Sequence, residues 1–295
     1  MPLPLRPLHV LILVGITVVW GLNFVVAKVG LLQLPPLLLM ALRWGLVGLL
    51  LAPFVKPPSG RWGGVLAVSF TLGFVHFAMM FSGLREIDAA TAAIAIQLQV
   101  PFAALLAAVF FGDRLGWRRA LGMAIAFAGV AILAGEPRLD GRYGALALVI
   151  GASFVWAIAN FQVKKLGEID GFALNAWIGV LAAPQLLLGS LLLEQGQWAA
   201  LQAADWRAWL SVVYQALLAV IFGYGLWFRF LRHYTMNQII PFTLLVPLFG
   251  VASGVLFLAE PLTPARIAGG LLTVAGVGII ILRRPRLTAP QAERL

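Results

Sequence analysis

The chain has 295 residues and a net charge of +10, with 62% hydrophobic residues and only 11% Asp, Glu, Lys and Arg. Soluble domains carry about 25% charged residues, so this composition excludes a soluble enzyme or binding module and predicts a protein that lies mostly in lipid. The absence of cysteine excludes disulfides, thiolate metal sites and cysteine nucleophiles.

Ten long apolar segments follow one another along the chain. A bilayer is crossed by a helix of about 20 residues, whereas the strands of a membrane barrel are short and alternate apolar with polar residues. The first segment has no small-residue cleavage site after it, so we expect a retained helix and not a signal peptide. The sequence predicts an all-α integral membrane protein with ten transmembrane helices, at residues 9–29, 34–55, 63–84, 90–111, 115–135, 143–164, 172–193, 208–231, 237–259 and 264–282.

The first helix carries three candidate site residues. Trp20 and Asn23 lie about one turn apart on one helix face, which suits a cavity wall with an aromatic surface and an amide, although tryptophan also marks membrane interfaces. Lys28 is expected near the less basic side of the membrane, as a candidate to hold a substrate carboxylate.

Arg43 lies near the middle of the second helix, where an isolated charge costs several kcal/mol. Such an arginine is expected to face the protein interior. Two interpretations stay open: Arg43 binds an anionic group of a substrate, or it anchors the fold by binding backbone carbonyls. The seventh helix has no matching arginine, so a site built on Arg43 is asymmetric.

His76 in the third helix is the only histidine well inside a predicted span. It either contacts substrate or a proton, since its pKa ordinarily lies near physiological pH, or it packs in the core. In the fourth helix, Gln97 and Gln99 precede Pro101, which frees a backbone carbonyl one turn earlier and can kink the helix. Amides and free carbonyls together would make an uncharged hydrogen-bonding wall.

Small residues form one face of the fifth helix and one face of the tenth. They are Gly122, Ala126 and Gly129 in the fifth, and Gly269, Thr273 and Gly276 in the tenth. Small residues let helix backbones approach closely in lipid, so we expect these two helices to pack tightly, either on each other or across a homodimer.

The later helices add further candidates. Trp156 and Asn160 in the sixth helix repeat the spacing of the first, and Tyr224 and Trp227 in the eighth could complete an aromatic wall. In the ninth helix Thr243 stands between two prolines. Paired interruptions in corresponding helices of two repeats indicate a transport site, and the alternative that these kinks serve only helix packing stays open.

The second half of the chain repeats motifs of the first. Asn-Phe, a Lys and a Gly recur at an offset of 137 between the first and sixth helices, and acid and glycine positions of the fifth and tenth recur at an offset of 147. Since five is odd, the second set must cross in the opposite sense. This predicts inverted five-helix repeats at 1–136 and 137–285, followed by a cytoplasmic tail at 286–295.

The distribution of charge predicts the topology. With the N-terminus in the cytoplasm, fourteen of the 21 Lys and Arg residues fall on the cytoplasmic side. This bias places both termini there and explains the basicity as a topology signal and not as nucleic-acid binding. All eleven Asp and Glu residues fall in loops or at helix ends. No cluster has metal-ligand spacing, so we predict no catalytic residue, no metal and no cofactor.

Several motifs resemble those of the EamA family of the drug/metabolite transporter superfamily: Val19-Trp20-Gly-Leu-Asn23-Phe24, Pro35-Pro36…Leu42-Arg43, Phe111-Gly-Asp113-Arg-Leu115 and Leu244-Leu-Val-Pro247. The resemblance covers the chain as two repeats and is closest to bacterial amino-acid and metabolite exporters. It implies a ten-helix carrier of the bacterial inner membrane with a central cavity between its halves. Glu260-Pro-Leu262 departs from the family pattern, in which many members keep an Arg-like residue after the acid, and this leaves the packing there open.

These observations predict a secondary transporter that exports small amino acids or amino-acid-like metabolites by alternating access around a midplane cavity. The expected lining is Trp20, Asn23, Lys28, Arg43, His76, Gln97, Gln99, Trp156, Asn160 and Thr243. The alternatives are a broad-specificity drug or organic-cation exporter, disfavoured by the lack of a buried acid, and a lipid flippase. Membrane lipid is the expected surrounding, and proton coupling and a homodimer stay open.

Overall fold

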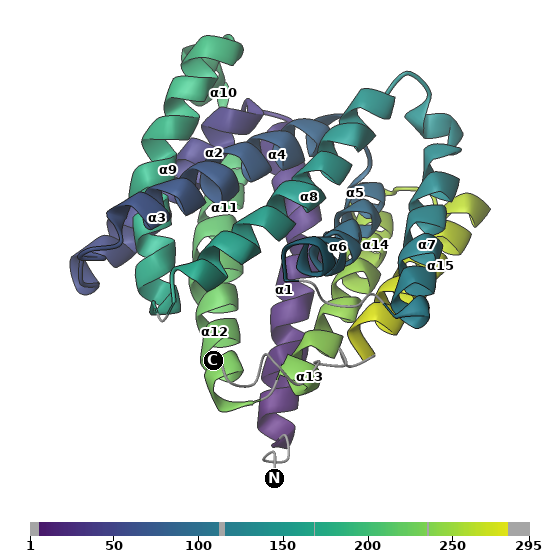
Figure 1. The fold of residues 1–295 in the computed structure, drawn as a ribbon. Coiled ribbons are helices and arrows are strands. Elements are labelled where there is room, and N and C mark those ends of the chain that lie inside the picture. Colours follow the sequence, from purple (N-terminus) through teal and green to yellow (C-terminus); the bar gives the residue numbers. More distant parts are fainter. Residues whose placement is uncertain (1–5, 112–115, 168, 235, 283–295) are drawn as a thin grey trace, which may run out of the picture.

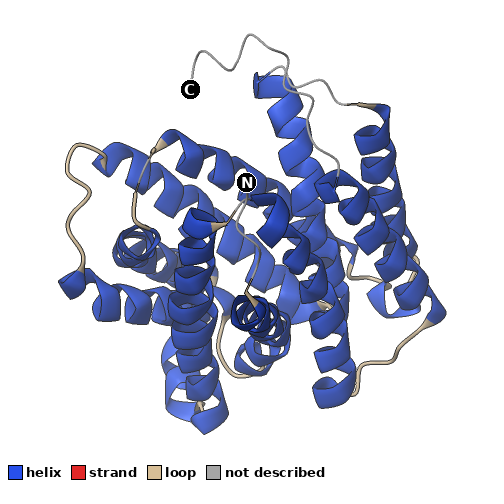
Figure 2. Cartoon of the chain, turned by 90° about the horizontal axis from the view of Figure 1, so that it is seen from below, coloured by secondary structure: helices blue, strands red, loops and turns tan. Residues whose placement is uncertain are grey.

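The computed structural model of this chain describes residues 6–111, 116–167, 169–234 and 236–282. Within them the chain forms helices and connections, with no strand (Figure 2). Ten of the helical stretches are long and apolar enough to cross a membrane. The predicted all-α membrane fold with ten spanning helices is therefore confirmed. The Asp113-Arg-Leu115 motif and the 286–295 tail lie outside the described residues.

The first five spans occupy the chain up to residue 134 (Figure 1). They are α1 (Pro7–Leu31); α2 (Pro36–Leu51) with the turn η1 (Ala52–Phe54); α3 (Trp62–Val68), η2 (Ser69–His76) and α4 (Phe77–Glu86) as one span; α5 (Ala89–Ala95), η3 (Ile96–Leu98) and α6 (Gln99–Phe111) as one span; and α7 (Trp117–Ala134).

The other five spans follow a short turn, η4 (Pro137–Leu139). They are α8 (Tyr143–Lys165); α9 (Gly171–Leu193), followed by the short α10 (Gln197–Ala203); α11 (Trp206–Tyr214), η5 (Gln215–Tyr224) and α12 (Gly225–His233) as one span; α13 (Met236–Ile239), η6 (Ile240–Leu244) and α14 (Leu245–Leu258); and α15 (Pro264–Leu282).

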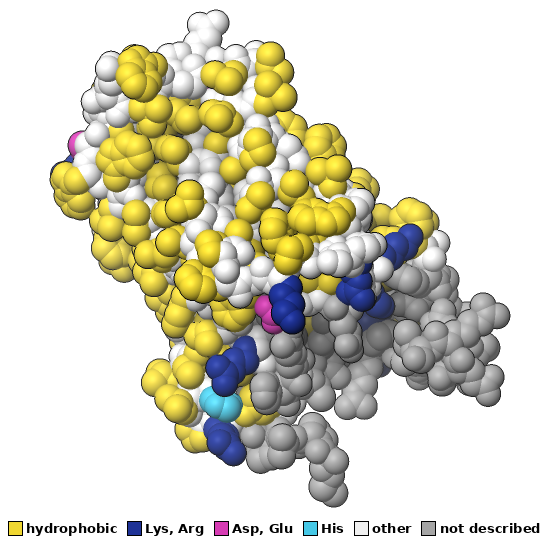
Figure 3. All heavy atoms as spheres, turned by 90° about the vertical axis from the view of Figure 1, so that its left-hand side faces the viewer, with side chains coloured by type: hydrophobic (Ala, Val, Ile, Leu, Met, Phe, Trp, Pro, Cys, Tyr) yellow, Lys and Arg dark blue, Asp and Glu magenta, His cyan; other side chains and the backbone are white. Residues whose placement is uncertain are grey.

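We call the end of the molecule at which α1 begins the lower end, and the end that carries the α4–α5 connection the upper end (Figure 1). The side of the molecule drawn in Figure 3 is mostly apolar, and its Lys and Arg side chains gather toward the lower end. A broad apolar surface with cations at one edge is what lipid contact and the positive-inside rule predict.

Two spans contain π-helical segments, which the sequence analysis did not foresee. η2 interrupts the third span and ends at His76, and η5 interrupts the eighth and ends at Tyr224. π-helical turns are rare and frequently mark functional sites. The two segments lie in spans that correspond to each other when the chain is divided into five-helix halves.

The proline-rich spans are interrupted where the sequence predicted. A 3₁₀ turn, η3, precedes Pro101 in the fourth span, and a second, η6, contains Pro241 in the ninth. Because proline removes a backbone donor and clashes with the preceding turn, the α-helix is replaced at these places by a 3₁₀ turn.

Glycine faces bring α7 and α15 into backbone contact. A Cβ added to Gly276 would lie 2.5 Å from the Ala126 nitrogen and 2.5 Å from the Gly122 oxygen, and one added to Gly129 would lie 2.6 Å from the Gly269 oxygen. The predicted tight packing is thus confirmed, and the fifth and tenth spans pack on each other within one chain.

The second and seventh spans, α2 and α9, meet in the same way. A Cβ on Gly48 would lie 2.8 Å from the Val180 nitrogen, and one on Gly179 would lie 2.7 Å from the Gly48 nitrogen. Since α2 carries Arg43, this close crossing fixes the helix that presents the charge to the interior.

Candidate functional site

Arg43 points from α2 into the protein interior. Its side chain is only 2% exposed. The guanidinium carbon lies 4.5 Å from the ring centroid of Phe77, 5.4 Å from that of Trp44 and 5.9 Å from that of Phe81. Aromatic faces attract a cation and stabilise it when water is excluded. The arginine is therefore held by aromatic rings from α2 and α4.

The hydrogen-bonding capacity of Arg43 is largely unused. Its Nη1 donates a long bond, 3.6 Å, to the sulfur of Met40, and its Nε is buried without an acceptor among the described residues. The indole nitrogen of Trp44 next to it is also buried without an acceptor there. Buried donors without partners cost free energy, and all of these groups are donors, so the position suits a ligand that brings acceptor oxygens.

Aromatic rings from α1, η2, α8, η5 and α12 continue this environment. Trp156 on α8 lies 5.0 Å from the His76 ring and 6.4 Å from the Tyr224 ring, with which it stacks. Trp20 on α1 lies 5.1 Å from Tyr224 and 5.3 Å from Trp227. The row links Trp20, Tyr224, Trp156 and His76, and His76 lies 4.7 Å from Phe77 and so reaches the rings around Arg43.

We call these residues the central cluster: Trp20, Arg43, Trp44, His76, Phe77, Trp156 and Tyr224. Arg43 and His76 lie against the same ring, that of Phe77, at 4.5 and 4.7 Å from its centroid. The last residue of each π-helical segment, His76 of η2 and Tyr224 of η5, thus belongs to the cluster. The sequence predicts every member of the cluster except Trp44 and Phe77, which directly follow Arg43 and His76 in the chain.

His76 is oriented by one backbone contact. Its Nδ1 lies 2.9 Å from the carbonyl oxygen of Ala152 on α8, and its side chain is 4% exposed. A carbonyl only accepts, so Nδ1 carries the proton in this contact and Nε2 keeps its lone pair when the ring is neutral. The ring therefore offers one acceptor to a ligand in the neutral form and one donor after protonation.

Trp20 is fixed against the π-helical segment of the eighth span. Its indole nitrogen donates to the carbonyl oxygen of Ala219 at 3.0 Å. A Cβ at Gly223 would lie 2.5 Å from that nitrogen, so glycine is needed for the indole to reach its acceptor.

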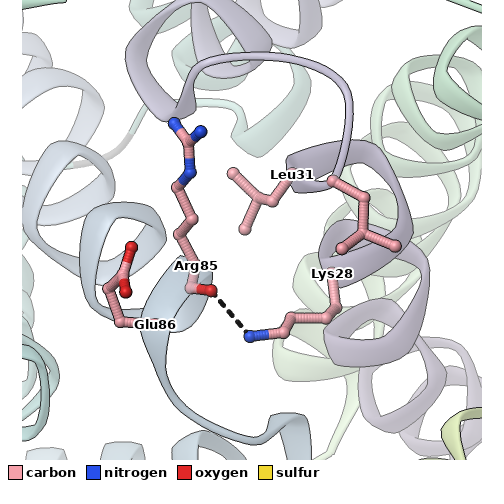
Figure 4. A pocket seen from close by; sticks show the side chains of 5 residues that line it. Lys28, Leu31, Arg85 and Glu86 are labelled. Atoms are coloured by element: carbon pink, nitrogen blue, oxygen red, sulfur yellow. Dashed lines mark hydrogen bonds between the residues drawn. The ribbon is translucent and has the colours of Figure 1, made fainter. Parts of the chain in front are cut away.

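Lys28 lies at the upper end, away from the central cluster. Its Nζ donates to the carbonyl oxygens of Leu84, Arg85 and Ile87 at 2.8, 2.8 and 2.7 Å. An ammonium group has three donors, so Lys28 has none left for a substrate carboxylate. It lines a cavity of about 200 Å³ together with Leu31, Leu32, Arg85 and Glu86 (Figure 4).

The amide candidates are divided between interior and surface. Asn23 shares its α1 face with Trp20, and its Oδ1 is buried without a partner among the described residues. Gln97 is buried, and Gln99 is half-buried. Asn160 is exposed, and its Nδ2 donates to Trp156 O within its own helix at 3.0 Å.

Thr243 uses its hydroxyl within its own 3₁₀ turn, where it donates to Ile240 O at 2.7 Å. The structure thus brings Trp20, Arg43, His76 and Trp156 together and places Lys28, Asn160 and Thr243 elsewhere. Among the described residues no group of three or more His, Asp or Glu side chains could hold a metal ion.

Comparisons with known proteins agree with this architecture. The EamA-like transporter family matches residues 8–135 and again residues 143–282. A "Probable amino-acid metabolite efflux pump" of Salmonella typhimurium is 36% identical over 93% of this chain and 95% of its own length, and one of Escherichia coli is 35% identical over 90% and 91%.

Two more distant proteins match as well. A "Probable terminal-alkyne amino-acid exporter" of Streptantibioticus cattleyicolor is 28% identical over 77% of this chain and 75% of its own length. A solved crystal structure with 18% identity covers 90% of this chain and 94% of its own, with a TM-score of 0.64, which shows a shared fold.

Proposed function

Because this chain belongs to the EamA-like transporter family, we propose that it exports amino acids or amino-acid-like metabolites across the bacterial inner membrane. Family membership establishes a membrane transporter and not an enzyme. The cargo and the direction are our proposal, and two relatives named as amino-acid metabolite efflux pumps support them.

The observation that carries the proposal is Arg43, a buried cation that rests on aromatic rings without a carboxylate partner among the described residues. An unpaired charge inside a membrane protein is expensive and usually functional. A substrate carboxylate would supply the missing acceptors, since guanidinium and carboxylate match in a two-bond geometry.

The surroundings of Arg43 also offer contacts for the rest of an amino acid. The row of Trp20, Tyr224 and Trp156 offers ring faces to an apolar or aromatic side chain. The partnerless Oδ1 of Asn23 is a suitable acceptor for the ammonium group. In this arrangement His76 lies beside the carboxylate site, because it packs on the same Phe77 ring as Arg43.

Alternating access around this site follows from the repeat. We propose inverted repeats at 1–136 and 137–285, supported by the two family matches and by the paired π-helical and 3₁₀ interruptions. The cations that gather at the lower end support a cytoplasmic location for that end and for both termini (Figure 3).

The test is uptake of labelled amino acids into proteoliposomes, with competition by each amino acid and by its amide, which lacks the carboxylate. We expect saturable uptake of a subset, competition by the acids only, and loss of uptake in Arg43→Met. Arg207→Met is the matched control, since Arg207 also lies over a tryptophan but is exposed at the upper end. Transport of organic cations with no response to carboxylates would favour the drug-exporter alternative.

A further inference from the structure

The connection between α4 and α5 at the upper end is held by charged side chains from distant parts of the chain. Lys28 on α1 binds three carbonyl oxygens of residues 84–87, as described above. Arg142 before α8 donates from Nη1 to the Glu86 carbonyl at 2.8 Å. These cations meet the C-terminal end of α4, where the helix dipole is negative.

The start of α5 is held by a negative charge, whereas the end of α4 is held by positive ones. Glu260, in the α14–α15 connection, accepts the backbone N–H groups of Ala89 and Ala90 at 2.7 and 2.9 Å. Arg266 on α15, only 1% exposed, donates from Nη2 to the Asp88 carboxylate at 2.6 Å. We call this set, from Lys28, Arg142, Glu260 and Arg266, the upper latch.

The latch joins helices of both halves at one end. Lys28 ties α1 to α4, and Glu260 and Arg266 tie the α14–α15 region to α5. Each contact is charge-assisted, which makes it stronger than a neutral bond, and the contacts of Glu260 and Arg266 are buried or partly buried. For the upper end to open, these contacts must break.

The second half of the chain contains residues equivalent to Lys28 and to the end of α4. Leu84-Arg85 at the end of α4 recurs as Leu231-Arg232 at the end of α12, at the offset of 147 found for the other motifs. Lys28 recurs as Lys165 at the end of α8, at the offset of 137. Inversion places this second arrangement at the lower end.

At the lower end Lys165 does not bind backbone carbonyl oxygens of the described residues as Lys28 does at the upper end. The ammonium of Lys165 lies 4.6 Å from the ring centroid of Phe161 on its own helix. Its side chain is exposed and has no hydrogen bond to any described residue. The same residue type is thus fully partnered at one end of the molecule and free of backbone acceptors at the other.

We infer that Lys28 and Lys165 are reciprocal latches of the transport cycle. In the state described here Lys28 closes the upper end. In the opposite state Lys28 releases residues 84–87, and Lys165 binds the carbonyl oxygens of Leu231, Arg232 and Tyr234. The inference rests on the proposed alternating access but not on the identity of the cargo.

Each lysine therefore stabilises one of two states, and removing it shifts the population toward the other. If removing either lysine only loosened the fold, both substitutions would change the accessibility of the upper end in the same direction. If the two lysines are reciprocal latches, the substitutions change it in opposite directions, so the experiment distinguishes the two explanations.

The chain has no cysteine, so a single introduced thiol reports accessibility without background. Thr91→Cys is a suitable reporter, because Thr91 is 1% exposed and contacts Arg266 at the upper end. Labelling by a water-soluble maleimide is measured for the full chain in nanodiscs without substrate, alone and combined with Lys28→Met, Lys165→Met or both. Thermal unfolding of each variant is recorded in parallel.

We expect Lys28→Met to raise the labelling rate by about tenfold or more, since bonds to charged groups contribute at least that factor. Lys165→Met should lower it, and the double variant should return toward the reporter alone. Arg85→Met is the matched control: it lines the same cavity, but only its backbone carbonyl meets Lys28 (Figure 4). Equal labelling in all variants, or a change of the same sign for both lysines, would overturn the inference.

Discussion

Arg43 at the centre and Lys28 at the upper end are both cations on membrane-spanning helices, yet they have different surroundings. Lys28 places all three N–H donors on backbone carbonyls. Arg43 rests on the rings of Phe77 and Trp44 and keeps a buried Nε without an acceptor among the described residues.

The difference separates two uses of buried charge. A charge whose donors are all satisfied contributes to holding helices in place, and removing it costs stability. A charge left on aromatic faces is stabilised only in part, so a ligand that pairs with it gains binding free energy. Charge at the centre should therefore affect substrate binding, and charge at the upper end should affect stability and the balance between the two states.

The largest expected effect is on transport in Arg43→Met, which keeps the volume but removes the guanidinium. We expect transport of carboxylate substrates to fall by more than about 100-fold, since a bond to a charged group contributes up to about 3 kcal/mol. The thermal unfolding midpoint should stay the same or rise, because a buried unpaired charge is lost. If Arg43→Met instead unfolds the protein, Arg43 is a structural anchor and the comparison fails.

The opposite result is expected for Glu260→Gln at the upper end. The variant keeps the shape of the side chain but replaces two charge-assisted bonds to the first turn of α5 by weaker ones. We expect a loss of about 1–2 kcal/mol in the free energy of unfolding, measured by thermal or denaturant unfolding in detergent. The preference for acids over amides, measured by competition, should persist, because Glu260 is not part of the central cluster.

A smaller effect tests the aromatic part of the centre. Trp156→Leu removes the ring that contacts both His76 and Tyr224. Since each aromatic pair contributes about 0.5–1.5 kcal/mol, we expect aromatic substrates to bind about tenfold more weakly, whereas the preference for acids over amides persists.

The control for this variant is Trp206→Leu, because Trp206 is exposed at the upper end. Equal loss for small and aromatic substrates in Trp156→Leu would show that the ring shapes the fold and not the side-chain pocket.

The smallest effect concerns pH at the upper end. The side-chain amide of Gln33 donates to Asp205 at 2.8 Å, and this bond, with the backbone N–H of Arg207, holds the pKa of Asp205 below its ordinary value of 3.8. A lowered pKa means that the contact stabilises the folded state fully above that value and loses its contribution as the pH falls through the folded-state pKa. Acidification below about pH 4 should therefore loosen the link between residues 32–35 and α11.

Hydrogen exchange of the first turn of α11 measures this change. Asp205→Asn should show faster exchange already at neutral pH and little further change on acidification. An unchanged exchange rate in both proteins across this range would show that the Gln33 contact does not order the helix start.

Much of the fold was determined by local properties of the chain. Hydropathy over about 20 residues predicts a span wherever it occurs, so all ten were found. Glycine spacing and proline act within one or two turns, and hence the α7–α15 contact and the interruptions before Pro101 and at Pro241 were foreseen. Trp20, Arg43, His76 and Trp156 were found as well, because polar or amphipathic groups at membrane depth stand out in an apolar sequence.

Only the tertiary structure decided what each polar group touches. Lys28 and Arg43 look alike as isolated cations, and their difference lies in partners contributed by other helices: carbonyls at residues 84–87 for one, the Phe77 ring for the other. The π-helical segments that bring His76 and Tyr224 to the centre have no simple sequence signal, because a π turn depends on how neighbouring helices pack. Composition and periodicity are properties of single segments, whereas hydrogen bonding at membrane depth is settled between segments.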